Sequence, residues 1–86
     1  MNPYINECGD KIWYKEGTMI LHREDGPTIE YTDGAKYWFI DGKIHREDGP
    51  AVENVNGIKY WFLYGEEIQV SSQEEFLRLI KLKAFW

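Results

Sequence analysis

The sequence has few of the features that mark several common protein classes. Its 86 residues include one cysteine, Cys8, so no disulfide can form within the chain, whereas a small secreted domain usually carries several. No apolar run approaches the roughly 20 residues needed for a transmembrane helix. Residues 1–7 lack the basic and apolar regions of a secretion signal. These absences predict a cytoplasmic protein with no membrane contact.

Positive charge is also scarce. The chain has 15 acidic and 10 basic residues, which gives a net charge of −5. A nucleic-acid backbone requires a basic surface, so direct nucleic-acid binding is not expected. A partner protein with a basic surface is compatible with this charge, because opposite charges steer association.

A repeat of about 23 residues organises the chain. Residues 22–27, His-Arg-Glu-Asp-Gly-Pro, recur as residues 45–50, and each copy continues with a small residue, a β-branched residue and a glutamate. A second motif, Gly-x-Lys-x-Trp-aromatic-x-x-Gly, occurs three times, at 9–17, 34–42 and 57–65. The third copy is not followed by a His-Arg-Glu-Asp block. One domain over residues 1–86 is expected, with a repeat array at 9–70 and a different segment at 71–86.

The spacing of the glycines indicates β structure. All eight glycines lie seven to nine residues apart, and the runs between them are rich in aromatic and β-branched residues. Asp41-Gly42 and similar pairs tolerate the positive φ of tight hairpins. The pattern predicts a mainly β fold, a single antiparallel sheet of repeated hairpins. The expected strands are 11–15, 19–22, 28–32, 36–40, 51–55, 59–63 and 66–70.

The segment 71–86 has the pattern of a helix. Ser72 and Glu75 form a capping box, acidic residues fill the first turn, and basic residues follow. Phe76, Leu79 and Ile80 lie on one stripe. Because an open repeat array exposes its last apolar face, we expect a C-terminal α-helix that caps the sheet.

The repeat resembles the MORN family of β-hairpin repeats, and more closely its variant repeats. The wording W-[FY]-x-x-G-K-x-H-R-x-D-G-P-A is carried by residues 38–51 and is similar to repeats in proteins of bacteriophages, giant viruses and some bacteria. The resemblance covers roughly residues 9–70. It implies a one-dimensional sheet of hairpins that serves as a scaffold or as a contact surface for proteins or lipids.

The His-Arg-Glu-Asp block allows three interpretations. His22, Asp25, His45 and Asp48 are residue types that ligate metals. His22, Arg23, His45 and Arg46 could instead hold an anionic, nucleotide-like ligand. A structural role explains both copies at once, since arginine can bridge to a carboxylate and aspartate can bond within its own turn. We favour the structural interpretation, with no metal and no cofactor expected.

The aromatic residues predict a docking surface. Trp13, Trp38 and Trp61 occupy equivalent positions, and their Tyr and Phe neighbours point to the opposite face. A small sheet with one helix cannot easily cover both faces. Lys11, Lys36 and Lys59 are also equivalent, either as solvated edge charges or as a basic stripe. The expected partner-binding residues are Trp38, Trp61, Tyr37, Tyr60, Phe39, Phe62 and Trp86.

These observations predict a binding protein and not an enzyme. No serine or cysteine has a nucleophile-elbow context, and no phosphate-binding glycine loop is present. The resemblance and small size favour a phage-type protein that inhibits a host or defence protein in the host cytoplasm. The alternatives are sequestration of an anionic nucleotide and a structural role in oligomers, including a homodimer.

Overall fold

In the computed structural model, which describes residues 2–83, short antiparallel strands lead into one helix. The strands are β1 (Tyr4–Ile5), β2 (Lys11–Ile12), β3 (Ile29–Glu30), β4 (Lys36–Tyr37), β5 (Phe39–Ile40), β6 (Lys43–Ile44), β7 (Val52–Glu53), β8 (Lys59–Leu63) and β9 (Glu66–Ile68). The helix is α1 (Gln73–Lys83). The predicted mainly β fold with a C-terminal helix is confirmed.

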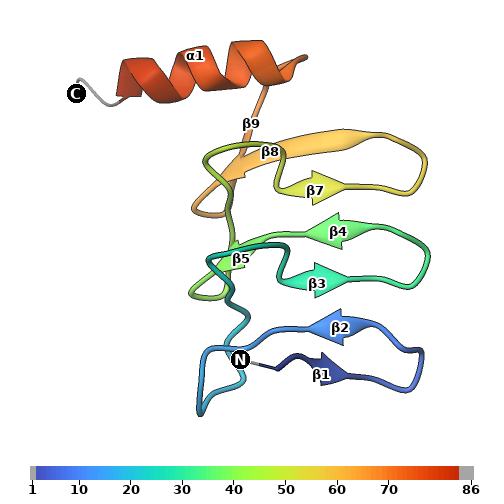
Figure 1. Ribbon diagram of the computed structural model, residues 1–86. Helices are drawn as coiled ribbons and strands as arrows, with labels where there is room; N and C mark the ends of the chain where they lie inside the picture. The colour runs from blue at the N-terminus through green and yellow to red at the C-terminus, as the bar shows by residue number, and fades with distance from the viewer. Residues whose placement is uncertain (1, 84–86) are drawn as a thin grey trace.

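The strands form a single thin layer. Seven of them make one sheet in the order β1-β2-β3-β4-β7-β8-β9, and β5 pairs with β6. Trp38 alone separates β4 from β5. The β5–β6 hairpin joins its neighbours through backbone bonds, from the Gly42 N–H to the Leu21 carbonyl and from the Gly65 N–H to the Ile44 carbonyl, both 2.8 Å. The strands therefore lie one above another, with the β1–β2, β3–β4 and β7–β8 turns on one side, the other turns on the opposite side, and α1 across the top (Figure 1).

Two strands lie outside the expected ranges. β1 precedes the first repeat glycine, and β6 lies between Gly42 and the second His-Arg-Glu-Asp block. β1 lies outside the repeat motifs, and in β6 only Ile44 is a residue that favours strands. Both acquire strand geometry from the neighbour they pair with, β2 and β5 respectively.

One row of cross-strand neighbours alternates in charge. In register across β2, β3, β4, β7 and β8 lie Lys11, Glu30, Lys36, Glu53 and Lys59. Opposite charges on facing strands stabilise a sheet, whereas like charges directly opposite destabilise it. The three equivalent lysines are therefore separated by glutamates and form no basic stripe.

The adjacent row, on the other face of the sheet, is apolar. It runs through Tyr4, Ile12, Ile29, Tyr37, Val52 and Tyr60. Ile29 and Val52 are buried in the middle of this row, while Tyr4 and Tyr60 are exposed. The side chains of this row are thus buried at its centre and exposed at both ends.

The tight hairpins use positive φ angles at two neighbouring residues. Asp41 and Gly42 have φ values of 50° and 80°, as Asp-Gly predicts. At the equivalent position of the next repeat, Tyr64 and Gly65 have φ values of 49° and 87°. A bulky residue rarely adopts such a backbone conformation. The contacts that hold Tyr64 there come from the preceding repeat and are described below.

Helix α1 takes the place of a third His-Arg-Glu-Asp block. Its first turn is capped by Ser72, whose hydroxyl accepts the Glu75 N–H at 3.2 Å, and this half of the predicted capping box is confirmed. Phe76 is fully buried, with its ring 6.3 Å from that of Trp61. The Gln73 side chain accepts the Trp61 indole N–H and donates to the Asp48 carbonyl, both at 2.9 Å. The helix is thereby joined to β8 and to the loop 45–50.

Candidate functional site: the acidic loop face

The loops 22–27 and 45–50 bulge from one face of the sheet. The Arg23 N–H donates to the Phe39 carbonyl at 3.2 Å, and the Thr28 N–H donates to the Tyr37 carbonyl at 2.7 Å. Both ends of the first loop are therefore bonded to the neighbouring segment, one at the end of β4 and the other at the start of β5, two residues apart. The residues between these ends have no room in the sheet and must project from it. Together, the two loops form what we call the acidic loop face.

Each loop is closed internally by its arginine. Arg46 donates from Nε to Asp48 at 2.9 Å, and from Nη1 to the Pro50 carbonyl and to Glu53, both at 3.0 Å. In the first copy, Arg23 makes the same three contacts with Asp25, Pro27 and Glu30 at 3.0, 3.0 and 3.2 Å. Bonds between charged partners are the stronger kind of hydrogen bond. Each guanidinium is thus shared by two carboxylates of its own repeat.

The arginines also cover the tryptophans. The guanidinium carbon lies 3.7 Å from the Trp13 ring centroid in the first copy and 3.9 Å from that of Trp38 in the second, which is cation–π geometry. A Cβ at Gly49 would lie 2.7 Å from the Arg46 guanidinium carbon. The glycine of each block is therefore needed for this close approach.

Each histidine fastens one repeat to the hairpin turn of the next. Nδ1 of His45 accepts the Tyr64 N–H, and Nδ1 of His22 accepts the Asp41 N–H, both at 2.9 Å. Since Nδ1 is an acceptor, we infer that the proton resides on Nε2. In His45 this nitrogen bonds to Glu47 at 3.2 Å, and the Tyr64 ring stacks on the imidazole with 4.0 Å between centroids. These contacts account for the positive φ of Tyr64.

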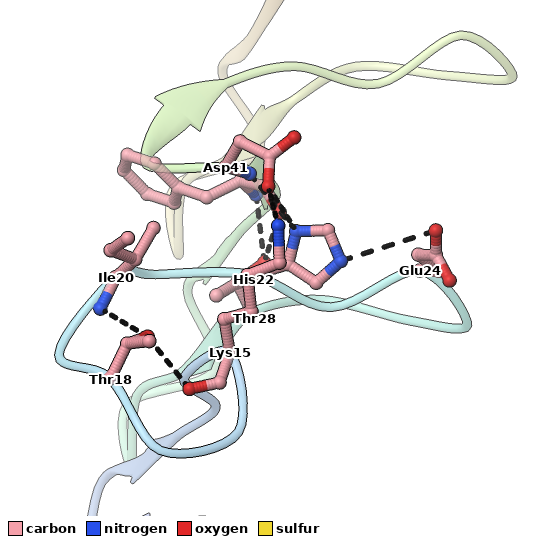
Figure 2. A network of polar contacts seen from close by, with 8 residues as sticks. Lys15, Thr18, Ile20, His22, Glu24, Thr28 and Asp41 are labelled. Carbon is pink, nitrogen blue, oxygen red and sulfur yellow. Dashed lines mark hydrogen bonds and ion pairs between the residues drawn. The ribbon is translucent and has the colours of Figure 1, made fainter.

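The first repeat has an additional ion pair at this position. Lys15 Nζ donates to Asp41 at 2.6 Å, and the same carboxylate lies 3.6 Å from His22 Nδ1 (Figure 2). The loop that contains the two extra residues of this repeat is closed nearby, where the Thr18 hydroxyl donates to the Lys15 carbonyl at 2.7 Å. Asp41 therefore connects the β5–β6 turn to the loop of the first repeat that contains Lys15.

The rim of the acidic loop face is lined with exposed carboxylates, of which Glu24 and Glu47 do not contact an arginine. Glu24, Asp25, Glu47 and Asp48 are exposed, whereas both arginines are mostly covered. Between the two loops lies a groove of about 740 Å³. Its floor and walls are formed by Arg23, Glu24, Asp25, Gly26, Pro27, Trp38, Ile40, His45, Arg46, Glu47, Asp48 and Tyr64.

Three aspartates of the chain are stabilised as anions. The pKa of Asp25 is lowered by the hydrogen bond from Arg23, that of Asp41 by Lys15, and that of Asp10 by the Thr32 backbone N–H. A carboxylate with a lowered folded-state pKa contributes stability above its unfolded pKa and loses it as the pH falls through the folded value.

We therefore expect the melting temperature to fall as the pH drops below about 4. Thermal denaturation followed by circular dichroism, from about pH 7 to about pH 2, checks this. Asp41→Asn should lower the melting temperature at neutral pH and flatten the acid decline. An acid decline as steep in this variant as in the wild type would contradict a contribution from Asp41.

The aromatic residues expected to bind a partner divide into two groups. Tyr60 is exposed, and Tyr37, Trp38, Phe39 and Phe62 are half-buried. Trp61 is only 7% exposed because α1 covers it, so it belongs to the core. Trp86 lies outside the described residues. Trp38 lies at the groove, whereas Tyr37 and Tyr60 lie in the apolar row on the opposite face, so these rings do not form one surface.

Three of the four residues of the alternative ligand site, Arg23, His45 and Arg46, line the groove between the loops, and His22 does not. Arg23 and Arg46 belong to successive loops and are matched by their own carboxylates, while His22 and His45 are bonded to backbone N–H groups. No group of three or more potential metal ligands occurs among residues 2–83. The geometry favours the structural interpretation of the block.

The sequence pattern does not single out the residues through which these loops reach solvent. Glu24 and Glu47 lie within the repeated block, and Tyr64, which also lines the groove, lies within the third Gly-x-Lys-x-Trp motif. The signal that could identify the glutamates is their position. They occupy the one charged site of the block whose side chain does not contact the arginine.

Comparison with known proteins yields no relative for this chain: no family model, curated protein or solved structure matches it. Among residues 2–83, no helix is both long and apolar enough to cross a bilayer.

Proposed function

We propose that the protein is a non-enzymatic binding module whose acidic loop face docks a partner protein with a basic surface. The observation that carries the proposal is the division of charge in the repeated loops. Arg23 and Arg46 are each paired with two carboxylates of their own repeat. Glu24 and Glu47 are exposed to solvent beside the groove. The surface is therefore negative, although each loop also contains an arginine and a histidine.

The groove supplies an anchor for the same partner. Trp38, Ile40 and Tyr64 provide apolar surface between the two acidic rims. Binding sites commonly combine a central aromatic contact with a polar rim, and charged rims raise the association rate. A basic side chain with an apolar stem fits such a groove, because its stem can contact the rings while its charge meets the carboxylates.

The same features support a non-catalytic role. The histidines of the loops have their Nδ1 atoms bonded to backbone N–H groups, and His45 is buried. A general base needs a free nitrogen within reach of a substrate proton. The resemblance to phage-type repeats extends the proposal to inhibition of a host or defence protein in the cytoplasm, which remains a prediction.

Charge reversal at the rim tests the proposal. Tagged wild-type protein and the Glu24→Lys/Glu47→Lys variant are used to capture partners from bacterial lysate, with identification by mass spectrometry. Glu66→Lys/Glu67→Lys is the matched control, since both glutamates are exposed in β9 and the net charge changes equally. We expect a basic protein captured by the wild type and the control to be lost with the rim variant.

The binding should also weaken as salt rises, because exposed charges are screened over about 10 Å at 0.1 M. Capture that is equal for the rim variant and the wild type would refute the proposal, as would the absence of any partner above background. Calorimetry with linear and cyclic nucleotides should show no binding heat. A nucleotide that binds through Arg23 and Arg46 would favour the alternative function.

A further inference from the structure

The groove between the loops has a counterpart in the first repeat. This second cavity, of about 460 Å³, is called here the first-repeat groove. Each of its lining residues except Glu16 has an equivalent that lines the groove, from the pair Trp13 and Trp38 to the pair Asp25 and Asp48. The array therefore repeats a cavity along with its strands.

The two cavities have one wall in common. Arg23, Glu24 and Asp25 line both of them, so the loop 22–27 separates two members of one series. The helix α1 occupies the place of the loop that would bound a third member. A partner that follows the acidic loop face along the array therefore meets these two cavities in succession.

Each cavity is lined by carboxylates that no arginine neutralises. Glu16 and Glu24 line the first-repeat groove, and Glu24 and Glu47 line the groove. Among residues 2–83, none of the three forms an ion pair with an arginine. The positive charge of Lys15 is matched by Asp41, at 2.6 Å (Figure 2). One basic side chain in each cavity is therefore the complement that this charge distribution fits.

The sheet sets the distance between the two cavities. Trp13 follows β2 and Trp38 follows β4, and one strand, β3, lies between these two. Neighbouring strands are about 4.8 Å apart, which places equivalent points of the cavities roughly 9.5 Å from each other. A polyproline II helix has three residues per turn, so every third side chain points the same way at intervals of about 9.3 Å. Side chains on one face of a β-strand recur at about 6.7 Å and do not match.

We propose that the acidic loop face binds a polyproline II segment that has arginine or lysine at every third position, with one basic side chain in each cavity. This inference rests on the proposed function and specifies the segment of the partner that is bound. Polyproline II segments dock on grooves lined by aromatic rings, which Trp38 and Tyr64 supply here. Their backbone groups remain solvated, so binding needs no free sheet edge.

Fluorescence anisotropy with three labelled peptides tests the spacing at low salt. The peptides share one composition, two arginines in a proline background, and place the arginines at positions i and i+2, i and i+3, or i and i+4. We expect the i, i+3 peptide to bind at least about tenfold more tightly than the other two, because only this spacing lets both cavities act together. An alanine-based helical peptide with arginines at i and i+7 is included, since two helical turns cover about 10.8 Å.

Glu16→Lys isolates the contribution of the first-repeat groove, because Glu16 lines that cavity alone. The variant should reduce the preference for the i, i+3 peptide to less than about threefold. Glu66→Lys is the matched control, since Glu66 is exposed in β9 and the charge change is the same. It should leave the preference unchanged, and circular dichroism should show both variants folded.

Equal affinities for the three spacings, tighter binding of the helical peptide, or no binding of any peptide would overturn the inference. So would a preference that survives Glu16→Lys or is lost on Glu66→Lys. The proposed function is decided separately, by the dependence of lysate capture on Glu24 and Glu47. A captured basic partner together with equal peptide affinities would show that the face binds its partner without this spacing.

Discussion

Replacing Phe76 with alanine is expected to lower the free energy of unfolding by about 3–5 kcal/mol, the range found for large aromatic residues in protein cores. The Phe76 side chain is fully buried and lies against Trp61. Its removal leaves a cavity where the helix meets the sheet. Because small domains are stable by only about 5–15 kcal/mol, the loss should bring this chain close to unfolding at room temperature.

Urea denaturation followed by far-ultraviolet circular dichroism measures this change. Leu77→Ala is the control, since Leu77 is the next residue of α1 and is 45% exposed. It should lower the free energy of unfolding by less than about 1 kcal/mol. Equal losses for the two variants would show that the helix does not stabilise the array by covering Trp61.

Replacing Arg46 with alanine is expected to cost about 2–3 kcal/mol, because it removes three hydrogen bonds and a cation–π contact that close the loop 45–50. The estimate allows for the partial exposure of the side chain. It also leaves Glu53 and the Pro50 carbonyl without their partner. In a domain of this size the melting temperature should fall by about 10 °C or more.

Thermal denaturation of three variants distinguishes the contribution of the planar guanidinium of Arg46 from that of its positive charge. Arg46→Lys keeps the charge but loses the planar fork, so it should recover less than half of the stability. Arg78→Ala removes an exposed ion pair to Glu74 and should cost about 0.5 kcal/mol or less. If Arg46→Ala leaves the melting temperature unchanged but abolishes ligand binding, the structural interpretation of the block is wrong.

The repeat explains why so much of the fold was predictable. Glycines at regular intervals mark turns, and the residues between them favour strands, so the antiparallel array followed from local patterns. The start of α1 was predicted for the same reason, because Ser72 and Glu75 are neighbours in sequence as well as in space. The pattern does not predict β1, which lies outside the repeat motifs, or β6, in which only Ile44 favours a strand.

The candidate site was harder to predict because its contacts cross between repeats. His45 bonds to the N–H of Tyr64, 19 residues away, and nothing in the local sequence of either residue indicates the other. The same holds for Phe76, which covers Trp61 as the arginines cover Trp13 and Trp38. A phenylalanine on a helix and an arginine in a loop have no motif in common, so their equivalence appears only in space.

The sequence by itself determined the period of the array, the turn positions, the helix that ends it and the net negative charge. These properties depend on residues close together in the chain, whose conformational preferences act locally. Only the tertiary structure decided which charged side chains form ion pairs and which are exposed to solvent without one. Arg46 contacts Asp48 and Glu53, and Glu47 is left at the rim, because both ends of the loop are bonded to β8, at the Phe62 and Tyr60 carbonyls, and the loop therefore folds back on its own arginine.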